Sequence, residues 1–118
     1  NTFIQEGARV ALTSSQDCVE EMVKEFARRR KLMMSCFDDI GISYKPPQGA
    51  FYLFPSIKQF GMNSEEFCNF LLNEARVAVV PGSAFGELGE GYVRFSYTTD
   101  YELIKEAMER VKSALKRL

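Results

Sequence analysis

The sequence contains no histidine, and this absence narrows the chemistry open to it. Neither a Ser-His nor a Cys-His nucleophile can be assembled, and the usual zinc patterns lose a main ligand. Cysteine is also scarce: Cys18, Cys36 and Cys68 are odd in number and far apart. This argues against a disulfide framework and fits a reducing cytosol. We therefore expect a cytoplasmic protein without a metal site, in which each cysteine is a small buried hydrophobic residue.

The sequence also has no excess of positive or negative charge. The 15 Lys and Arg residues face 16 Asp and Glu residues, for a formal net charge of −1. No global field attracts nucleic acid or an anionic membrane. No apolar run approaches the roughly 20 residues of a membrane span, and the start shows no signal-peptide pattern. We expect neither a nucleic-acid partner nor a membrane.

What is present is enough for one compact core. The chain has 118 residues, of which 46% are hydrophobic, a size that favours one domain over two. It opens at Asn1 inside a segment with helical spacing of apolar residues. We therefore expect a processed chain or a piece of a longer protein.

The first third of the chain predicts two helices. Apolar residues recur at helical spacing in the opening segment, and a second stripe ends at Gly41, a left-handed stop. The second helix would be about 25 residues long, above the usual length. Its start is expected at a cap formed by Thr13 with Gln16 or by Ser14 with Asp17. Its stripe is Val19, Val23, Phe26, Met33, Phe37 and Ile40. For the basic run 28–31 we favour a solvated face with pairs such as Glu25 to Arg29 over a nucleic-acid site.

The remainder predicts three strands and two helices. Strands are expected at 50–54, 77–80 and 92–97, since valine and aromatic residues lie there between glycine and proline. Asn63 and Glu66 cap a helix between the first two strands, and Thr99 and Glu102 cap the last helix. The inner faces of these helices are Phe67, Phe70, Leu71 and Ala75, then Ile104, Ala107, Met108, Val111, Leu115 and Leu118.

These elements predict an α+β fold with a small three-stranded mixed sheet covered by helices and preceded by a long helix. A strand, a helix and a strand in succession imply a parallel pair with a right-handed crossover. Inserted antiparallel between them, 92–97 becomes the central strand, as in a split βαβ unit. Residues 50–54 are apolar on both faces and require cover on both sides, so we infer a second domain outside this chain.

Arg94 is the candidate site residue. Alternation in 92–97 places it opposite the apolar face formed by Val93, Phe95 and Tyr97. A partly buried guanidinium requires a carboxylate or phosphate partner. From the residues alone we favour a salt-bridged or solvent-facing arginine in a domain of unknown role over a binding residue.

Two other patterns carry weaker indications. Gly82, Gly86, Gly89 and Gly91 match neither the dinucleotide fingerprint nor the P-loop, so we favour an ordinary flexible connection. The carboxylates of Asp38, Asp39, Glu65, Glu66, Glu87 and Glu90 sit at expected helix ends or in loops, where capping or solvation explains them better than acid and base catalysis.

Three blocks taken together resemble a known family. They are GAFYLFP at 49–55, VAVVPGSAFG at 77–86 and GYVRFSY at 91–97. In order and spacing they resemble the C-terminal small domain of class I/II (fold type I) pyridoxal-phosphate aminotransferases, over essentially the whole chain. The resemblance implies that residues 1–41 join a large domain absent from this chain and that 42–118 form the sheet-and-helix core. It also implies that Arg94 binds the substrate α-carboxylate, that Gly49, Ala50 and Phe51 lie near the active site, and that the domain closes over the substrate.

The resemblance further implies a cofactor and partners. Pyridoxal 5'-phosphate would serve the full-length enzyme, a homodimer acting on amino acids and 2-oxo acids. The family's Schiff-base lysine block has no counterpart here, and Ser56-Ile57-Lys58 only superficially resembles it, so we assign this chain no catalytic or cofactor-binding residue. Alone, it is expected to be inactive. Two alternatives remain: a non-catalytic carboxylate-binding module, and another fold type I enzyme such as a lyase or synthase.

Overall fold

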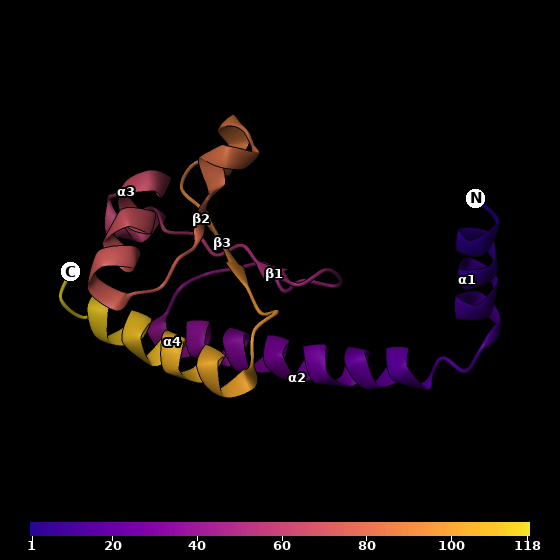
Figure 1. Cartoon of the computed structure of the whole chain (residues 1–118). Helices are drawn as coiled ribbons and strands as arrows, with labels where there is room; N and C mark the ends of the chain where they lie inside the picture. Colours follow the sequence, from indigo (N-terminus) through magenta and orange to yellow (C-terminus); the bar gives the residue numbers. More distant parts are fainter.

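The structure, a computed structural model, describes residues 1–118 as four α-helices, a small sheet and four short helical turns (Figure 1). The α-helices are α1 (Thr2–Thr13), α2 (Asp17–Ile40), α3 (Ser64–Phe70) and α4 (Tyr101–Leu115). The strands are β1 (Tyr52–Leu53), β2 (Val80–Pro81) and β3 (Val93–Ser96). The turns are η1 (Lys58–Phe60), η2 (Leu71–Ala75, a π-helical turn), η3 (Gly82–Phe85) and η4 (Glu87–Gly89). The predicted α+β class is confirmed.

The sheet has the order β1-β3-β2, with β3 in the centre as predicted. Tyr52 pairs with Ser96 and Val80 pairs with Arg94, and both pairings are antiparallel. The sheet therefore has no parallel pairing, and the expectation of a mixed sheet is corrected. β1 and β2 are shorter than expected. Ala50, inside the first expected strand, has a left-handed φ of 59°, which is incompatible with a regular strand.

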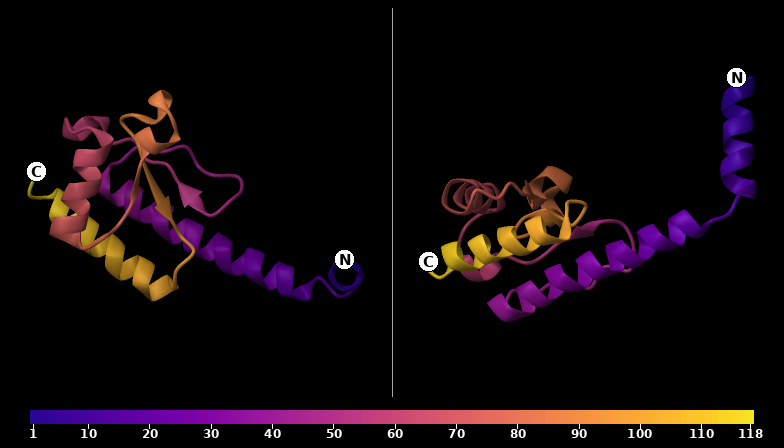
Figure 2. Two further views of the ribbon diagram at one scale, coloured as in Figure 1. Left: turned by 45° about the horizontal axis from the view of Figure 1, so that its top comes forward. Right: turned by 60° about the horizontal axis from the view of Figure 1, so that its bottom comes forward.

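The core lies on one face of the sheet. The 16 buried hydrophobic residues of this core all fall between Met33 and Leu115. Phe37 of α2 meets Phe95 of β3 edge to face, with ring centroids 5.0 Å apart. The predicted alternation of β3 is confirmed, since Val93, Phe95 and Tyr97 are buried whereas Arg94 is half-buried and Ser96 exposed. Both views in Figure 2 show α2 and α4 on the same side of the sheet.

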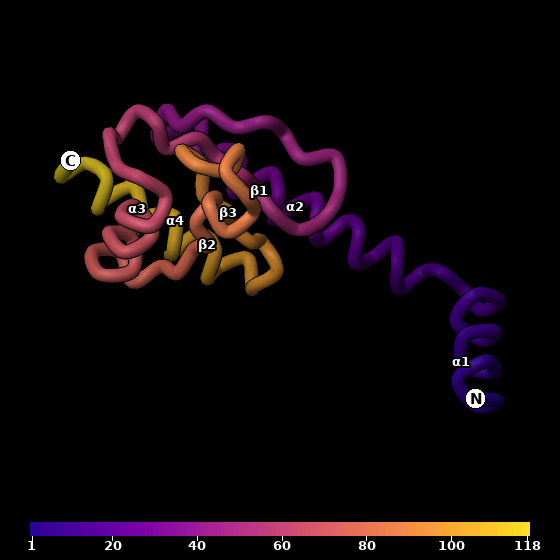
Figure 3. The backbone as a smooth tube through the Cα atoms, turned by 90° about the horizontal axis from the view of Figure 1, so that it is seen from above, coloured from indigo at the N-terminus to yellow at the C-terminus, as the bar shows by residue number.

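The long helix α2 has 24 residues and ends at Gly41 with φ 79°, as predicted. Its buried residues are only Met33 and Phe37, however, and Val19 and Val23 at its start are exposed. The predicted stripe is therefore wrong over the first half of the helix, because α2 extends beyond the sheet there (Figure 3). α1 lies farther out still and buries no residue. None of the four α-helices combines the length and the apolar character that a membrane span requires.

The predicted N-terminal cap forms at α3 but not at α2. At α3, the Asn63 side chain accepts a hydrogen bond from the Glu66 amide and the Glu66 side chain accepts one from the Asn63 amide, which confirms the capping box. At α2 neither predicted cap forms. Gln16 is the N-cap and makes no side-chain cap bond, while the Asp17 amide donates to Ser15 Oγ at 3.2 Å.

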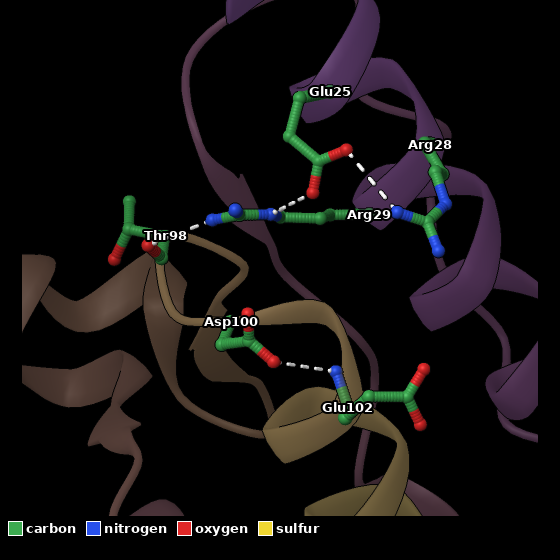
Figure 4. Close-up of polar contacts among 6 residues, drawn as sticks. All are labelled: Glu25, Arg28, Arg29, Thr98, Asp100 and Glu102. Carbon is green, nitrogen blue, oxygen red and sulfur yellow. Dashed lines mark hydrogen bonds and ion pairs between the residues drawn. The ribbon is translucent and has the colours of Figure 1, made fainter.

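The end of the chain corrects two further expectations. Asp100, rather than Thr99, is the N-cap of α4, and its carboxylate accepts a hydrogen bond from the Glu102 amide at 2.9 Å (Figure 4). Leu118 lies beyond the last helical residue and is exposed, so it is not part of the inner face. Ala114 is buried there instead.

The basic run on α2 connects this helix to the rest of the fold. The predicted pair is confirmed, with Arg29 Nε 2.8 Å from Glu25 Oε1. Arg29 also donates to the carbonyl of Thr98, just before α4, at 3.1 Å (Figure 4). Its side chain is only 18% exposed, so the prediction of a solvated face is wrong for this residue.

The neighbouring arginines have similar contacts. Arg28 places its guanidinium carbon 3.7 Å from the centre of the Tyr101 ring in α4. Arg30 donates to the carbonyl of Pro47 at 2.7 Å. Arg29 and Arg30 therefore attach α2 to the loops that precede α4 and β1 through backbone carbonyls, and Arg28 attaches it to α4 through the Tyr101 ring.

Candidate functional site

Arg94 lies on the sheet face that α2 and α4 do not cover, and no acidic side chain neutralises it. The ion pairs of the chain join Arg9, Arg28, Arg29, Arg110 and Arg117 to glutamates. The guanidinium carbon of Arg94 instead lies 4.3 Å from the ring centre of Tyr52 and 4.8 Å from that of Phe85. Its Nε atom is buried and has no hydrogen-bond partner. The site thus presents a half-buried cation that retains its full charge.

Strand register explains the contact with Tyr52. Tyr52 pairs with Ser96, which lies two residues from Arg94 on the same face of β3. Diagonal neighbours of this kind are within reach of long and aromatic side chains. Alternation within residues 50–54 indicates which face carries Tyr52, but the contact with Arg94 depends on the register between β1 and β3.

Phe85 reaches the site from η3 and is part of a row of aromatic rings. Phe54 meets Phe85 edge to face, with centroids 5.9 Å apart, and stacks on Tyr92 at 5.7 Å with an angle of 9° between the rings. Lys58 Nζ lies 4.9 Å from the centre of the Tyr92 ring. No periodic signal in the sequence indicated Phe85, because its contacts come from segments far apart in the chain.

The glycine-rich connection that carries Phe85 is a packed structure, so the expectation of an ordinary flexible connection is corrected. A Cβ atom placed on Gly82 would lie 1.9 Å from the carbonyl oxygen of Gly89, and one placed on Gly89 would lie 2.0 Å from that of Gly82. Both glycines are buried. Only residues without a side chain permit this approach of two backbones.

Glu90 fixes the end of the same connection. Its carboxylate accepts hydrogen bonds from the Ser64 hydroxyl and amide at 2.8 Å each and from the Gly91 amide at 2.9 Å. The Ser64 hydroxyl oxygen lies 3.0 Å from that of Ser83 in η3. These bonds, led by that from the Ser64 hydroxyl, lower the pKa of Glu90. Capping of α3 explains this carboxylate, in agreement with the prediction.

The turn at 49–51 faces α2. Phe51 packs against Phe26 of α2, with ring centroids 4.6 Å apart, and the Tyr97 hydroxyl donates to the carbonyl of Ala50 at 3.0 Å. Gly49, Ala50 and Phe51 line a surface cavity of about 370 Å³ together with residues of α2. From this part of the chain, the ring that contacts Arg94 is Tyr52.

The cysteines correct one expectation. All three are free, as predicted, but Cys18 is exposed rather than buried, because it lies on the part of α2 without neighbours. Cys36 and Cys68 are half-buried. Burial, with a smaller contribution from Glu65, raises the pKa of Cys68 to about 11, so its thiol stays protonated at neutral pH.

Comparison with known proteins places this geometry in a family. The sequence profile of the class I and II aminotransferases matches residues 1–111. The chain belongs to the class I and II aminotransferases. This aminotransferase chain is 52% identical over 117 residues to an aspartate aminotransferase of Pyrococcus abyssi. It is 50% identical over 117 residues to aromatic-amino-acid aminotransferase 2 of Thermococcus litoralis.

Both alignments cover 98% of this aminotransferase chain and 30% of the relative, so the chain spans about a third of the length of these relatives. Among solved structures, the aromatic aminotransferase of Pyrococcus horikoshii matches with a TM-score of 0.94 and 52% identity. That match covers 98% of this chain and 32% of the other.

Aminotransferases in general use pyridoxal phosphate, and the lysines of this aminotransferase chain do not fit a cofactor site. All of them are exposed except Lys112, which is half-buried on α4. A lysine that forms a Schiff base is activated by desolvation or by a neighbouring cation. Lys58 lies on the surface over the Tyr92 ring and lacks that shelter. In this structure no lysine of the chain therefore has the sheltered environment that a Schiff-base lysine requires.

Proposed function

We propose that this chain is the C-terminal small domain of a pyridoxal-phosphate-dependent aminotransferase that transfers an amino group between an amino acid and a 2-oxo acid. In this proposal Arg94 binds the substrate α-carboxylate. The observation that carries it is the charge of Arg94: a half-buried guanidinium in the central strand, with an unpartnered Nε and no acidic neighbour in ion-pair contact. Such a cation is unfavourable unless an anion reaches it.

The chemistry of the pair supports this assignment. A planar guanidinium meets a planar carboxylate through two parallel charge-assisted hydrogen bonds, which fix orientation as well as adding affinity. Binding the α-carboxylate in this way would orient the Cα–H bond of the substrate toward the cofactor, which supplies the electron sink of transamination. Arg94 is the binding residue, and the proton chemistry belongs to groups outside this chain.

The rest of the enzyme would complete the site. Residues 42–118 form the sheet-and-helix core, and residues 1–41 join the large domain. Exposed apolar side chains on α1 and the start of α2, such as Phe3, Leu12 and Met22, support a docking role for that segment. Closure of the open sheet face against the large domain would exclude water and strengthen the contact between Arg94 and the carboxylate. Gly49, Ala50 and Phe51 would lie near the mouth of the active site.

The same proposal covers cofactor and assembly. Pyridoxal 5'-phosphate would be bound by the large domain, and by family analogy the full-length enzyme is a homodimer in the cytoplasm. The 118-residue chain alone is therefore expected to show no turnover when mixed with pyridoxal phosphate and an amino acid. Turnover together with borohydride-trapped labelling of a single lysine would contradict this expectation.

The test of the proposal is Arg94→Ala in the full-length enzyme. Truncating one partner of a desolvated charge pair should lower kcat/KM by roughly 30-fold to 4,000-fold. Arg94→Lys should recover only part of the loss, since an ammonium cannot make the forked contact. Arg110→Ala is the matched control, because Arg110 is exposed and its nearest carboxylate oxygen, on Glu106, is 3.9 Å away. If Arg94→Ala has the kinetics of the control, the role of Arg94 is refuted.

A further inference from the structure

Arg94 has aromatic neighbours where a buried arginine usually has acidic ones. Its guanidinium carbon lies 4.3 Å from the Tyr52 ring centre and 4.8 Å from the Phe85 ring centre. Building on the proposed function, we propose that these two rings form a clamp that positions the guanidinium for the carboxylate, and that Phe85 is a positioning residue of the reaction. The clamp is defined here as Tyr52 and Phe85.

The physical reason lies in how an aromatic ring attracts a cation. The ring acts through its quadrupole, so it fixes the cation without neutralising its charge. A carboxylate in the same place would hold Arg94 more firmly, but it would compete with the substrate for the forked donors. Aromatic neighbours therefore restrict the arginine side chain in advance and leave its charge to the ligand, which lowers the entropic cost of binding.

Exposure distinguishes this clamp from ordinary core packing. Phe85 is 53% exposed and Tyr52 is 39% exposed, whereas the core residues of the same sheet, Leu53, Val93 and Phe95, are at most 4% exposed. These two large rings on the open sheet face are not part of the core of this domain. Within this chain both of them contact the guanidinium of Arg94.

The surrounding structure keeps Phe85 in place. η3 is fixed by the close approach of Gly82 and Gly89 and by the Ser83 hydroxyl, 3.0 Å from that of Ser64. Phe54 then supports the Phe85 ring edge to face at 5.9 Å. A surface loop without these contacts would not hold a ring at a defined distance from Arg94. The packed glycine connection therefore fixes the position of the Phe85 ring relative to the guanidinium.

The test is Phe85→Leu in the full-length enzyme. This change keeps most of the apolar volume and removes the quadrupole, so we expect KM for the amino acid to rise about threefold to thirtyfold. kcat should change by no more than about twofold, because saturating substrate restores the arginine-carboxylate pair. The inhibition constant of succinate, a dicarboxylate that lacks an amino group and serves as a carboxylate probe, should rise by the same factor as KM. Phe85→Tyr keeps the ring and should recover the parent values.

Two further variants make the result decisive. Phe60→Leu is the matched control, since Phe60 packs against Phe67 and has no contact with Arg94 among its ring contacts. Tyr52→Leu removes the other ring and provides an independent test if Phe85→Leu fails to fold. In each ring variant the Arg94 Nε–Hε resonance should lose the part of its ring-current shift that comes from the removed ring, which tests the contact itself. The rise in KM with little change in kcat, recovered in Phe85→Tyr, is the result that a purely structural role would not predict.

The outcomes separate this inference from the proposed function. If Arg94→Ala abolishes activity while Phe85→Leu and Tyr52→Leu behave like Phe60→Leu, the clamp is refuted and the proposed function stands. If Arg94→Ala is harmless, the proposed function fails and the clamp fails with it. Raised KM and succinate constants in both ring variants, with recovery in Phe85→Tyr, support the clamp.

Discussion

Gly82 and Gly89 approach each other so closely that a Cβ atom on Gly82 would lie 1.9 Å from the Gly89 carbonyl oxygen. The contact joins η3 to η4 and fixes the loop that carries Phe85 toward Arg94. A glycine is required here by backbone proximity rather than by its φ angle. The contact therefore connects the stability of the loop to the geometry of the candidate site.

Gly82→Ala should destabilise the chain by about 1–3 kcal/mol, because the added methyl group forces two backbone segments apart. Urea denaturation followed by circular dichroism would measure this loss. Gly49→Ala is the matched control: a Cβ on Gly49 meets nothing within 4 Å, so the free energy of unfolding should change by less than about 0.5 kcal/mol. Equal stability of the two variants would show that the close approach does not exist in solution.

Asp100→Ala should destabilise α4 by about 1 kcal/mol, because the helix loses the carboxylate that accepts the Glu102 amide. Thr99→Ala, one residue earlier, should have little effect, since Thr99 is not the cap. The two variants differ by one position and are compared by thermal or urea unfolding. A larger loss in Thr99→Ala would restore the capping box predicted from the sequence.

Glu90 predicts a pH dependence of stability. Hydrogen bonds from Ser64 and Gly91 lower its pKa below the ordinary value of 4.5. The folded state therefore favours the ionised carboxylate, and this contribution is fully present above about pH 4.5 and is lost as the pH falls through the lowered value. The free energy of unfolding should decrease over that acidic range.

The variant Glu90→Gln should remove that part of the pH dependence, because an amide cannot ionise and only one of its two polar atoms accepts hydrogen bonds. Glu87→Gln is the control, since Glu87 is an exposed residue of the same connection. Unfolding at pH 3 to 7 would compare the three proteins. An unchanged pH profile in Glu90→Gln would contradict the assigned hydrogen bonds.

Local patterns in the sequence were sufficient for much of the fold. The 24-residue α2 ending at Gly41, the Asn63 capping box and the two faces of β3 follow from interactions within a few residues, and all three predictions are confirmed. The wrong predictions arise where two neighbouring residues are equally good caps, or where a side chain contacts a segment distant in the sequence. Thr99 and Asp100 are both good caps, and only the backbone path selects Asp100.

The exposed stripe on α2 has a different origin. Val19 and Val23 have the spacing of core residues, yet nothing in this chain packs on them. Hydrophobic periodicity indicates that a helix face is buried, but it does not identify the segment or domain that covers that face. The same limit explains why the pattern of the basic run 28–31 predicts a solvated face although Arg29 reaches the Thr98 carbonyl.

The sequence by itself determined the α+β class, the central position of β3, the face on which Arg94 lies and the resemblance that the family comparison confirmed. These depend on periodicity and on short motifs, which are local properties of the chain. Only the tertiary structure decided that Tyr52 and Phe85 flank Arg94, that Gly82 meets Gly89, and that no carboxylate of this chain neutralises the guanidinium. Those contacts join residues distant in sequence, and their distances are set by how whole segments pack.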